Sequence, residues 1–130
     1  MQRQMLASFD GGRDAVVHER GPIDREHLAR YTLGEPTLER EVLALFAGQA
    51  EIHLTALKRA TTDTAWYEAA HTIKGSARAI GAWRVADCAL AAEMLKLGCD
   101  LARRDALLEG IADTLAEACR YIADLDRRPA

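Results

Sequence analysis

Apolar residues recur at alternating intervals of three and four positions through most of the chain, and this spacing constrains the fold more than any other feature. At about 3.6 residues per turn, it places the apolar side chains on one side of an α-helix. The pattern runs through four long segments separated by short breaks: residues 37–60, 64–80, 82–97 and 101–125. Each helix would have one apolar stripe, so the stripes must share a core. The sequence therefore predicts an all-α fold, an antiparallel up-down four-helix bundle.

The breaks contain residues that begin or end helices. A short additional helix at residues 23–33, capped by Asp24, precedes the bundle. Gly81 suits the C-terminal end of the second long helix, and Gly98 and Asp100 separate the last two. For the first long helix the spacing predicts this inward stripe: Leu38, Val42, Leu45, Phe46, Gln49, Ile52, Ala56 and Leu57.

Length and composition narrow the class of protein. A chain of 130 residues, with 49% hydrophobic and 5% aromatic residues, suits one helical domain. Residues 1–22 show no sustained periodicity, so we expect a flexible N-terminal arm before a bundle domain at residues 23–126. The net charge of −3 argues against nucleic-acid binding, and there is no apolar run of about twenty residues to span a membrane.

Two further features concern the cellular compartment. The three cysteines are odd in number and lack CxxC spacing, and the first twenty residues contain no apolar block of the signal-peptide type. Free cysteines of this kind fit a reducing environment. We therefore expect a cytoplasmic protein.

The second long helix has an unusual outer side. Its apolar stripe predicts that His71 lies about 140° from the stripe's centre and that Gly75 lies almost opposite it. Lys74 falls at the edge between core and solvent, and Arg78 on the outer side. Glycine within a helix costs about 1 kcal/mol relative to alanine. Because Gly75 points away from the stripe, its use indicates clearance for another surface that approaches His71.

These residues suit phosphoryl chemistry. An exposed imidazole is largely neutral near pH 7 and is a competent nucleophile towards phosphorus. The cations at Lys74 and Arg78 can pair with the added negative charge. The chain has no glycine-rich phosphate-binding loop, so we expect that it does not use ATP itself.

The pattern His71-x-x-Lys74-Gly75, followed by Gly81, resembles the signature of histidine-containing phosphotransfer (HPt) domains. The similarity covers about residues 24–125, and two flanking segments extend it. After Gly81, residues 83–97 carry Val85, Cys88 and Glu93 in the small-and-apolar pattern typical of the family. Before the histidine, residues 38–57 contain Phe46 and resemble the family's preceding helix.

The resemblance implies a phosphorelay protein. Its partners would be the receiver domains of response regulators and a hybrid sensor histidine kinase. The divalent metal ion would belong to the receiver, and the chain would need no cofactor of its own. In some HPt domains a carboxylate at the position of Glu93 orients the histidine. The candidate catalytic residues are His71, which would be phosphorylated, Lys74 and Gly75; the candidate partner-binding residues are Arg78, Gly81 and Glu93.

Two alternatives remain open. Glu68-x-x-His71 has the spacing of a ligand pair in ferritin-like metal bundles, but such a site needs a second pair, and Glu51-Ile52-His53 has the wrong spacing. A non-catalytic helical adaptor is the other alternative, against which the intact His71-x-x-Lys74-Gly75 set argues. We interpret His27 and His53 as ordinary bundle or rim residues and expect a monomer.

Overall fold

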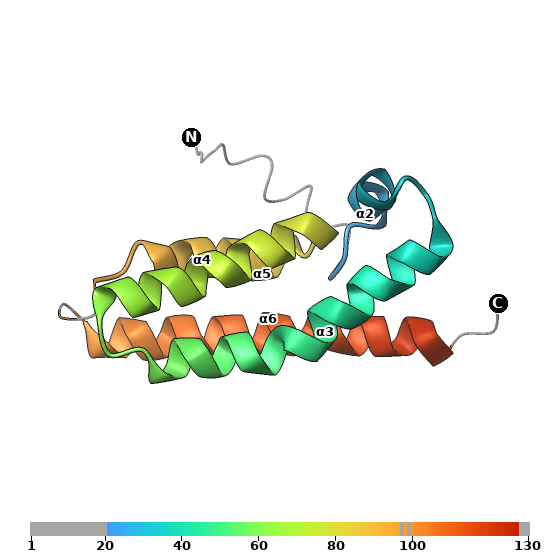
Figure 1. The fold of residues 1–130 in the computed structure, drawn as a ribbon. Helices are drawn as coiled ribbons and strands as arrows, with labels where there is room; N and C mark the ends of the chain where they lie inside the picture. The colour runs from blue at the N-terminus through green and yellow to red at the C-terminus, as the bar shows by residue number, and fades with distance from the viewer. Residues whose placement is uncertain (1–20, 97, 99, 128–130) are drawn as a thin grey trace.

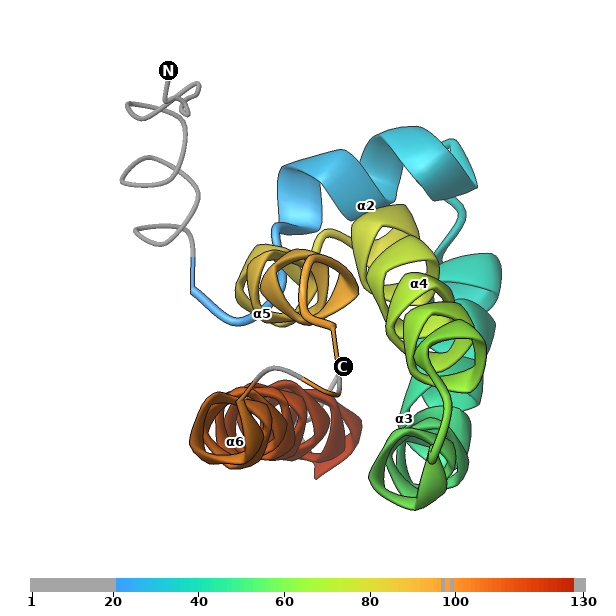
Figure 2. The ribbon, with the colours of Figure 1, turned by 90° about the vertical axis from the view of Figure 1, so that its left-hand side faces the viewer.

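The computed structural model describes residues 21–96, 98 and 100–127, and the regular structure within them is entirely α-helical. A short helix, α2 (Arg25–Thr32), precedes four longer ones: α3 (Pro36–Arg59), α4 (Asp63–Ile80), α5 (Trp83–Glu93) and α6 (Leu101–Arg127). Successive long helices run in opposite directions (Figure 1). Each packs against the next and α6 closes against α3, while α2 lies across α4 at one end (Figure 2). The predicted four-helix bundle with a short preceding helix is confirmed.

The core follows the predicted stripe of α4. All five of its members are buried: Trp66, Ala70, Ile73, Ala77 and Ile80. Trp66 also donates its indole N–H to the Ala92 carbonyl at 2.6 Å, which joins α4 to α5. Because this stripe faces inward, the opposite side of α4, with His71 and Gly75, faces solvent.

The predicted stripe of α3 is only partly correct: Phe46 and Leu57 are buried as expected, but other members are not. The residues that α3 buries are Leu43, Phe46, Ala50, Leu54 and Leu57. Leu45 and Ile52 are instead 60% and 65% exposed, and Leu38 is also exposed. This helix carries two apolar rows with helical spacing, and periodicity alone does not rank them. Packing against α4 and α6 selects the row that contains Leu43 and Leu54.

Helix α5 is shorter than predicted. It ends at Glu93, with Met94 as its C-cap residue, rather than at residue 97, so Glu93 lies in its last turn. Asp100 accepts a hydrogen bond from the Arg103 N–H at 3.0 Å, which confirms its expected capping role. Residues 97 and 99 lie outside the described part of the chain, as do residues 1–20 of the expected N-terminal arm.

Asp24 links α2 to the turn between α4 and α5 through hydrogen bonds. Its carboxylate accepts hydrogen bonds from the His27 backbone N–H at 3.1 Å and from the Trp83 indole N–H at 2.9 Å. Its own N–H donates to the Gly81 carbonyl at 2.9 Å. Gly81 ends α4 in the left-handed region, with φ +78°, as the sequence predicts for a C-terminal glycine.

Gly81 also lies very close to Asp24. A Cβ atom there would lie 2.9 Å from both the Cβ and the carbonyl oxygen of Asp24. The residue is also buried. Gly81 therefore has a structural role in this turn, and its expected contact with a partner stays a prediction.

No helix in the described part of the chain combines the length and hydrophobicity needed to cross a membrane.

Candidate functional site

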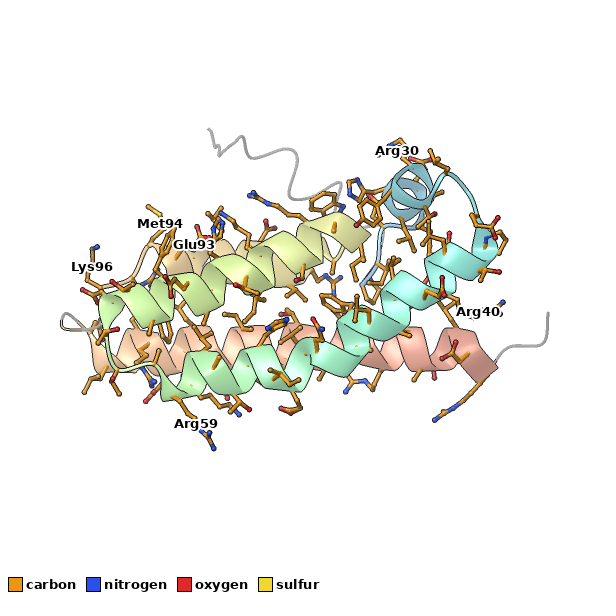
Figure 3. All side chains as sticks on the ribbon, viewed as in Figure 1. Arg30, Arg40, Arg59, Glu93, Met94 and Lys96 are labelled. Carbon is orange, nitrogen blue, oxygen red and sulfur yellow. The ribbon has the colours of Figure 1, made fainter. Side chains whose placement is uncertain are left out.

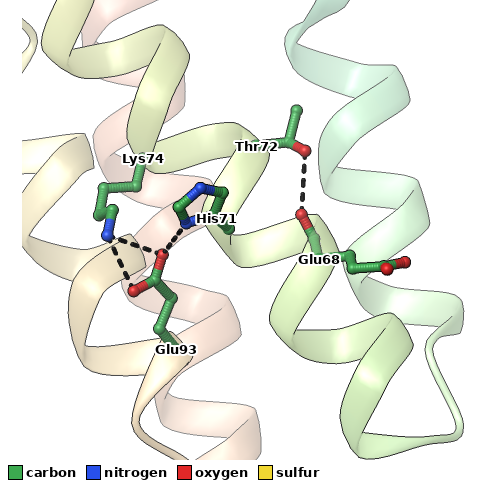
Figure 4. Close-up of polar contacts among 5 residues, drawn as sticks. All are labelled: Glu68, His71, Thr72, Lys74 and Glu93. Carbon is green, nitrogen blue, oxygen red and sulfur yellow. Dashed lines mark hydrogen bonds and ion pairs between the residues drawn. The ribbon is translucent and has the colours of Figure 1, made fainter.

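His71 stands on the outer side of α4 and is held by one ring nitrogen. Its side chain is 57% exposed, and Nδ1 lies 2.8 Å from Oε2 of Glu93 on α5 (Figure 4). Two helices thus supply the pair: α4 positions the imidazole, and the last turn of α5 positions the carboxylate. Met94, the next residue, points away from the bundle near Glu93 (Figure 3).

Glu93 also binds Lys74. The Lys74 Nζ atom lies 2.9 Å from each of the two carboxylate oxygens. Both side chains are largely covered, with 7% of Glu93 and 13% of Lys74 exposed. Burial alone raises the pKa of Glu93, but the hydrogen bonds and charges of Lys74 and His71 outweigh it and hold that pKa below its ordinary value. Glu93 is therefore ionised at neutral pH.

The ionised carboxylate determines which nitrogen of His71 carries the proton. A carboxylate only accepts hydrogen bonds, so Nδ1 is the donor and carries hydrogen. In the neutral ring, Nε2 then holds the free lone pair. The arrangement leaves Nε2 as the ring atom that can act as a nucleophile.

The ammonium group of Lys74 has a different partner from the one that the sequence predicts. Its position one turn from His71 predicts that the ammonium group meets a phosphoryl group directly. In the structure the ammonium group is bound to Glu93 and mostly covered. Its first effect is thus on Glu93, and through Glu93 on His71.

Gly75 has no packing role in the bundle. A Cβ atom at this position would meet no heavy atom within 4 Å, and the residue is exposed. The open space next to His71 supports the interpretation that glycine leaves clearance for a partner. Arg78, one turn further along, is also exposed, and its carbonyl accepts a hydrogen bond from Nε2–H of His27 at 2.8 Å.

His71 also has an aromatic neighbour, Tyr67, that is not among the site residues predicted from the sequence. Tyr67 stacks on His71 with ring centroids 5.5 Å apart and planes inclined by 16°. It precedes His71 by four residues, and side chains at that spacing meet on a helix surface, so the signal was present in the sequence.

The metal-binding alternative gains no support. Within the described residues, no group of three or more histidine, cysteine, aspartate or glutamate side chains could hold a metal ion. In Figure 4 the Glu68 carboxylate lies apart from the His71 ring, while the Glu68 backbone carbonyl accepts a hydrogen bond from Thr72 Oγ1 at 2.9 Å.

The fold and the site together define a helical bundle that presents an exposed histidine, oriented by a carboxylate from the next helix. A family model of the Hpt domain matches residues 41–125, from within α3 to within α6. The chain belongs to the Hpt domain family, which confirms the resemblance seen in the sequence. It is accordingly a histidine phosphotransfer domain of phosphorelays, a class that interacts with response-regulator receiver domains. No curated protein and no solved structure matches the chain.

Proposed function

We propose that this chain relays a phosphoryl group from a hybrid sensor histidine kinase to a response regulator, and that His71 carries it between their receiver-domain aspartates. The observation that supports this most is that the His71 ring is 57% exposed and yet held at Nδ1 by Glu93. An imidazole fixed at one nitrogen and open at the other presents its nucleophile in a defined direction.

The reaction balances without an added proton or co-reactant. The Nε2 lone pair attacks phosphorus in the aspartyl phosphate of the donor receiver, and the bond from phosphorus to the aspartate oxygen breaks. Since Nδ1 keeps its hydrogen, the phosphorylated ring is positively charged, and the Glu93 carboxylate, 2.8 Å away, stabilises it. The same bonds reverse at the acceptor receiver. The divalent metal ion belongs to the receivers, and the phosphoryl group comes from them rather than from ATP.

The receiver would dock over α4 and the groove beside it. Along the outer side of α4, Gly75 provides open space and the exposed Arg78 provides positive charge. On the flank, α2, α3 and α4 line a groove that contains these residues: Tyr31, Val42, Leu45, Phe46, Gln49, Ser76, Ala79 and Ile80. A receiver seated there would cover Leu45, which the bundle leaves exposed.

We further propose that the chain acts as a cytoplasmic monomer, with residues 23–126 as the functional domain.

The test is transfer of a labelled phosphoryl group from purified phospho-receivers of the source organism. His71→Gln should abolish labelling and keep the helix content. His53→Gln is the matched control, because His53 is a half-buried histidine of α3, and it should label normally. Acid-labile label that persists in His71→Gln would refute the assignment. A profile over all receivers would identify donor and acceptor, and no transfer from any receiver would favour an adaptor.

A further inference from the structure

Tyr67 and His71 present flat, nearly parallel rings on the surface of α4. Their centroids are 5.5 Å apart and their planes differ by 16°. Neither ring is oriented by the core, because Tyr67 is 47% exposed and the His71 side chain 57%. The orientation of the imidazole therefore depends on its few surface contacts, of which the structure shows the Glu93 hydrogen bond and the Tyr67 ring.

The hydrogen bond sets the general direction of the ring but leaves some freedom in its plane. Nδ1 lies off the Cβ–Cγ axis, so the bond restrains rotation about that axis, but a hydrogen bond tolerates a range of angles and this torsion has broad minima. The lone pair of Nε2 lies in the ring plane, so a tilt of the ring moves the lone pair away from the line of attack on phosphorus. Small errors of this kind are costly, because transfer requires aligned reacting atoms.

We propose that Tyr67 is a positioning residue for phosphoryl transfer, which holds the His71 ring plane so that Nε2 points at the incoming phosphorus. This inference rests on the proposed function of His71. Parallel stacking resists tilt of the imidazole, whereas Glu93 resists displacement of Nδ1. The tyrosine face also lies within the range of cation–π attraction, about 6 Å, so it favours the positively charged ring formed on phosphorylation.

Two substitutions separate the flat ring from the rest of the side chain. Tyr67→Phe keeps the ring, and Tyr67→Leu keeps an apolar side chain and helix propensity without it. The single-turnover rate at saturating phospho-receiver should fall about two- to tenfold in the leucine variant and stay at the parent value in the phenylalanine variant. The receiver concentration at half-saturation should be the same in all three proteins.

Two further readouts do not depend on receiver contacts. The ring protons of His71 should show the ring-current shift of a stacked neighbour by NMR in the parent and the phenylalanine variant, and lose it in the leucine variant. Phosphorylation of His71 by a small phosphoramidate donor should slow in the leucine variant as well, because this donor cannot contact Tyr67 through a docked protein.

The outcomes distinguish the two levels of the hypothesis. A leucine variant with the parent's maximal rate, or with unaltered His71 proton shifts, would overturn the positioning role. A change in half-saturation alone would make Tyr67 a contact of the receiver instead. If the parent protein itself accepts no phosphoryl group from any receiver, the proposed function fails, whatever the NMR shows about stacking.

Discussion

Glu93→Gln is the sharpest test of the site, because the side chain keeps its shape and loses its charge. Two donors converge on this carboxylate: His71 Nδ1 at 2.8 Å, and Lys74 Nζ at 2.9 Å from both oxygens. In a glutamine the amide oxygen can take the place of Oε2, which contacts both donors, but the NH₂ group then takes the place of Oε1 and faces the Lys74 ammonium group, donor against donor. The substitution therefore removes at least one charge-assisted hydrogen bond, which is worth about 1.5–3 kcal/mol.

If this energy acts in the transition state, transfer slows by about tenfold to a hundredfold, at about 1.4 kcal/mol per decade. The assay is single-turnover transfer from a phospho-receiver, with urea unfolding of the same samples to show that the bundle persists. Glu68→Gln is the matched control, since Glu68 is an exposed carboxylate three residues before His71 on the same helix. Transfer at the parent rate in Glu93→Gln, or an equal slowing in Glu68→Gln, would refute a role of the Glu93 charge in transfer.

The lowered pKa of Glu93 predicts how stability depends on pH. Because the pKa is lower in the folded protein than its ordinary value of 4.5, the unfolded chain binds a proton more readily at this position. The stabilising contribution is complete above pH 4.5 and is lost as the pH falls below it through the folded-state pKa. Urea unfolding should be followed between pH 6 and pH 3, about 1.5 units on either side of that ordinary value. The free energy of unfolding should fall more steeply with pH in the parent than in Glu93→Gln. Parallel curves would contradict the lowered pKa of Glu93.

Two glycines give further predictions, each with a matched glycine as control. Gly75→Ala should raise the free energy of unfolding by up to about 1 kcal/mol and slow phosphoryl transfer. Gly48→Ala also adds a Cβ atom to open space on a helix, and it should stabilise the protein without slowing transfer. A Gly75→Ala protein that is destabilised but transfers normally would refute the proposal that Gly75 leaves space for a partner. Gly81→Ala should lower the free energy of unfolding by about 1–3 kcal/mol or more, because the strain of a positive φ and the contact with Asp24 add together. Gly34→Ala has the positive φ but open space around the new Cβ atom, so its loss of stability should be smaller. Equal losses in urea unfolding would show that the contact with Asp24 is unimportant.

The patterns of α3 and α4 show what periodicity can and cannot predict. In α4 the opposite side is polar or small, so only one row of residues can face the core, and the predicted stripe is the buried one. In α3 two rows are apolar, and the choice between them depends on helices far away in the sequence. The exposed row, with Leu45 and Ile52, is consistent with a helix that serves both the bundle and a partner.

The site divides along similar lines. The exposed position of His71 and the open space at Gly75 follow from helical phase, which is local information. The contact of Glu93 with His71 joins residues on two helices, and the sequence offered it only through the family resemblance. The burial of Gly81 against Asp24 depends on how α2 docks, which no local pattern encodes.

The pairing of Lys74 with Glu93 resolves a difficulty that the carboxylate alone would create. A negative charge beside His71 fixes the tautomer and stabilises the positively charged phosphohistidine ring, but it also repels an incoming phosphoryl group. Lys74 lies 2.9 Å from both carboxylate oxygens, so the pair carries no net charge while Glu93 still accepts the hydrogen bond from Nδ1. Lys74→Ala should therefore act against transfer in the same direction as the loss of Glu93, although the two residues have opposite charges. If the lysine acted only as a cation for the phosphoryl group, its removal would matter equally with or without Glu93. We expect instead that the double variant Lys74→Ala/Glu93→Gln is less impaired than the product of the two single effects, which a double-mutant cycle on the single-turnover rate measures directly.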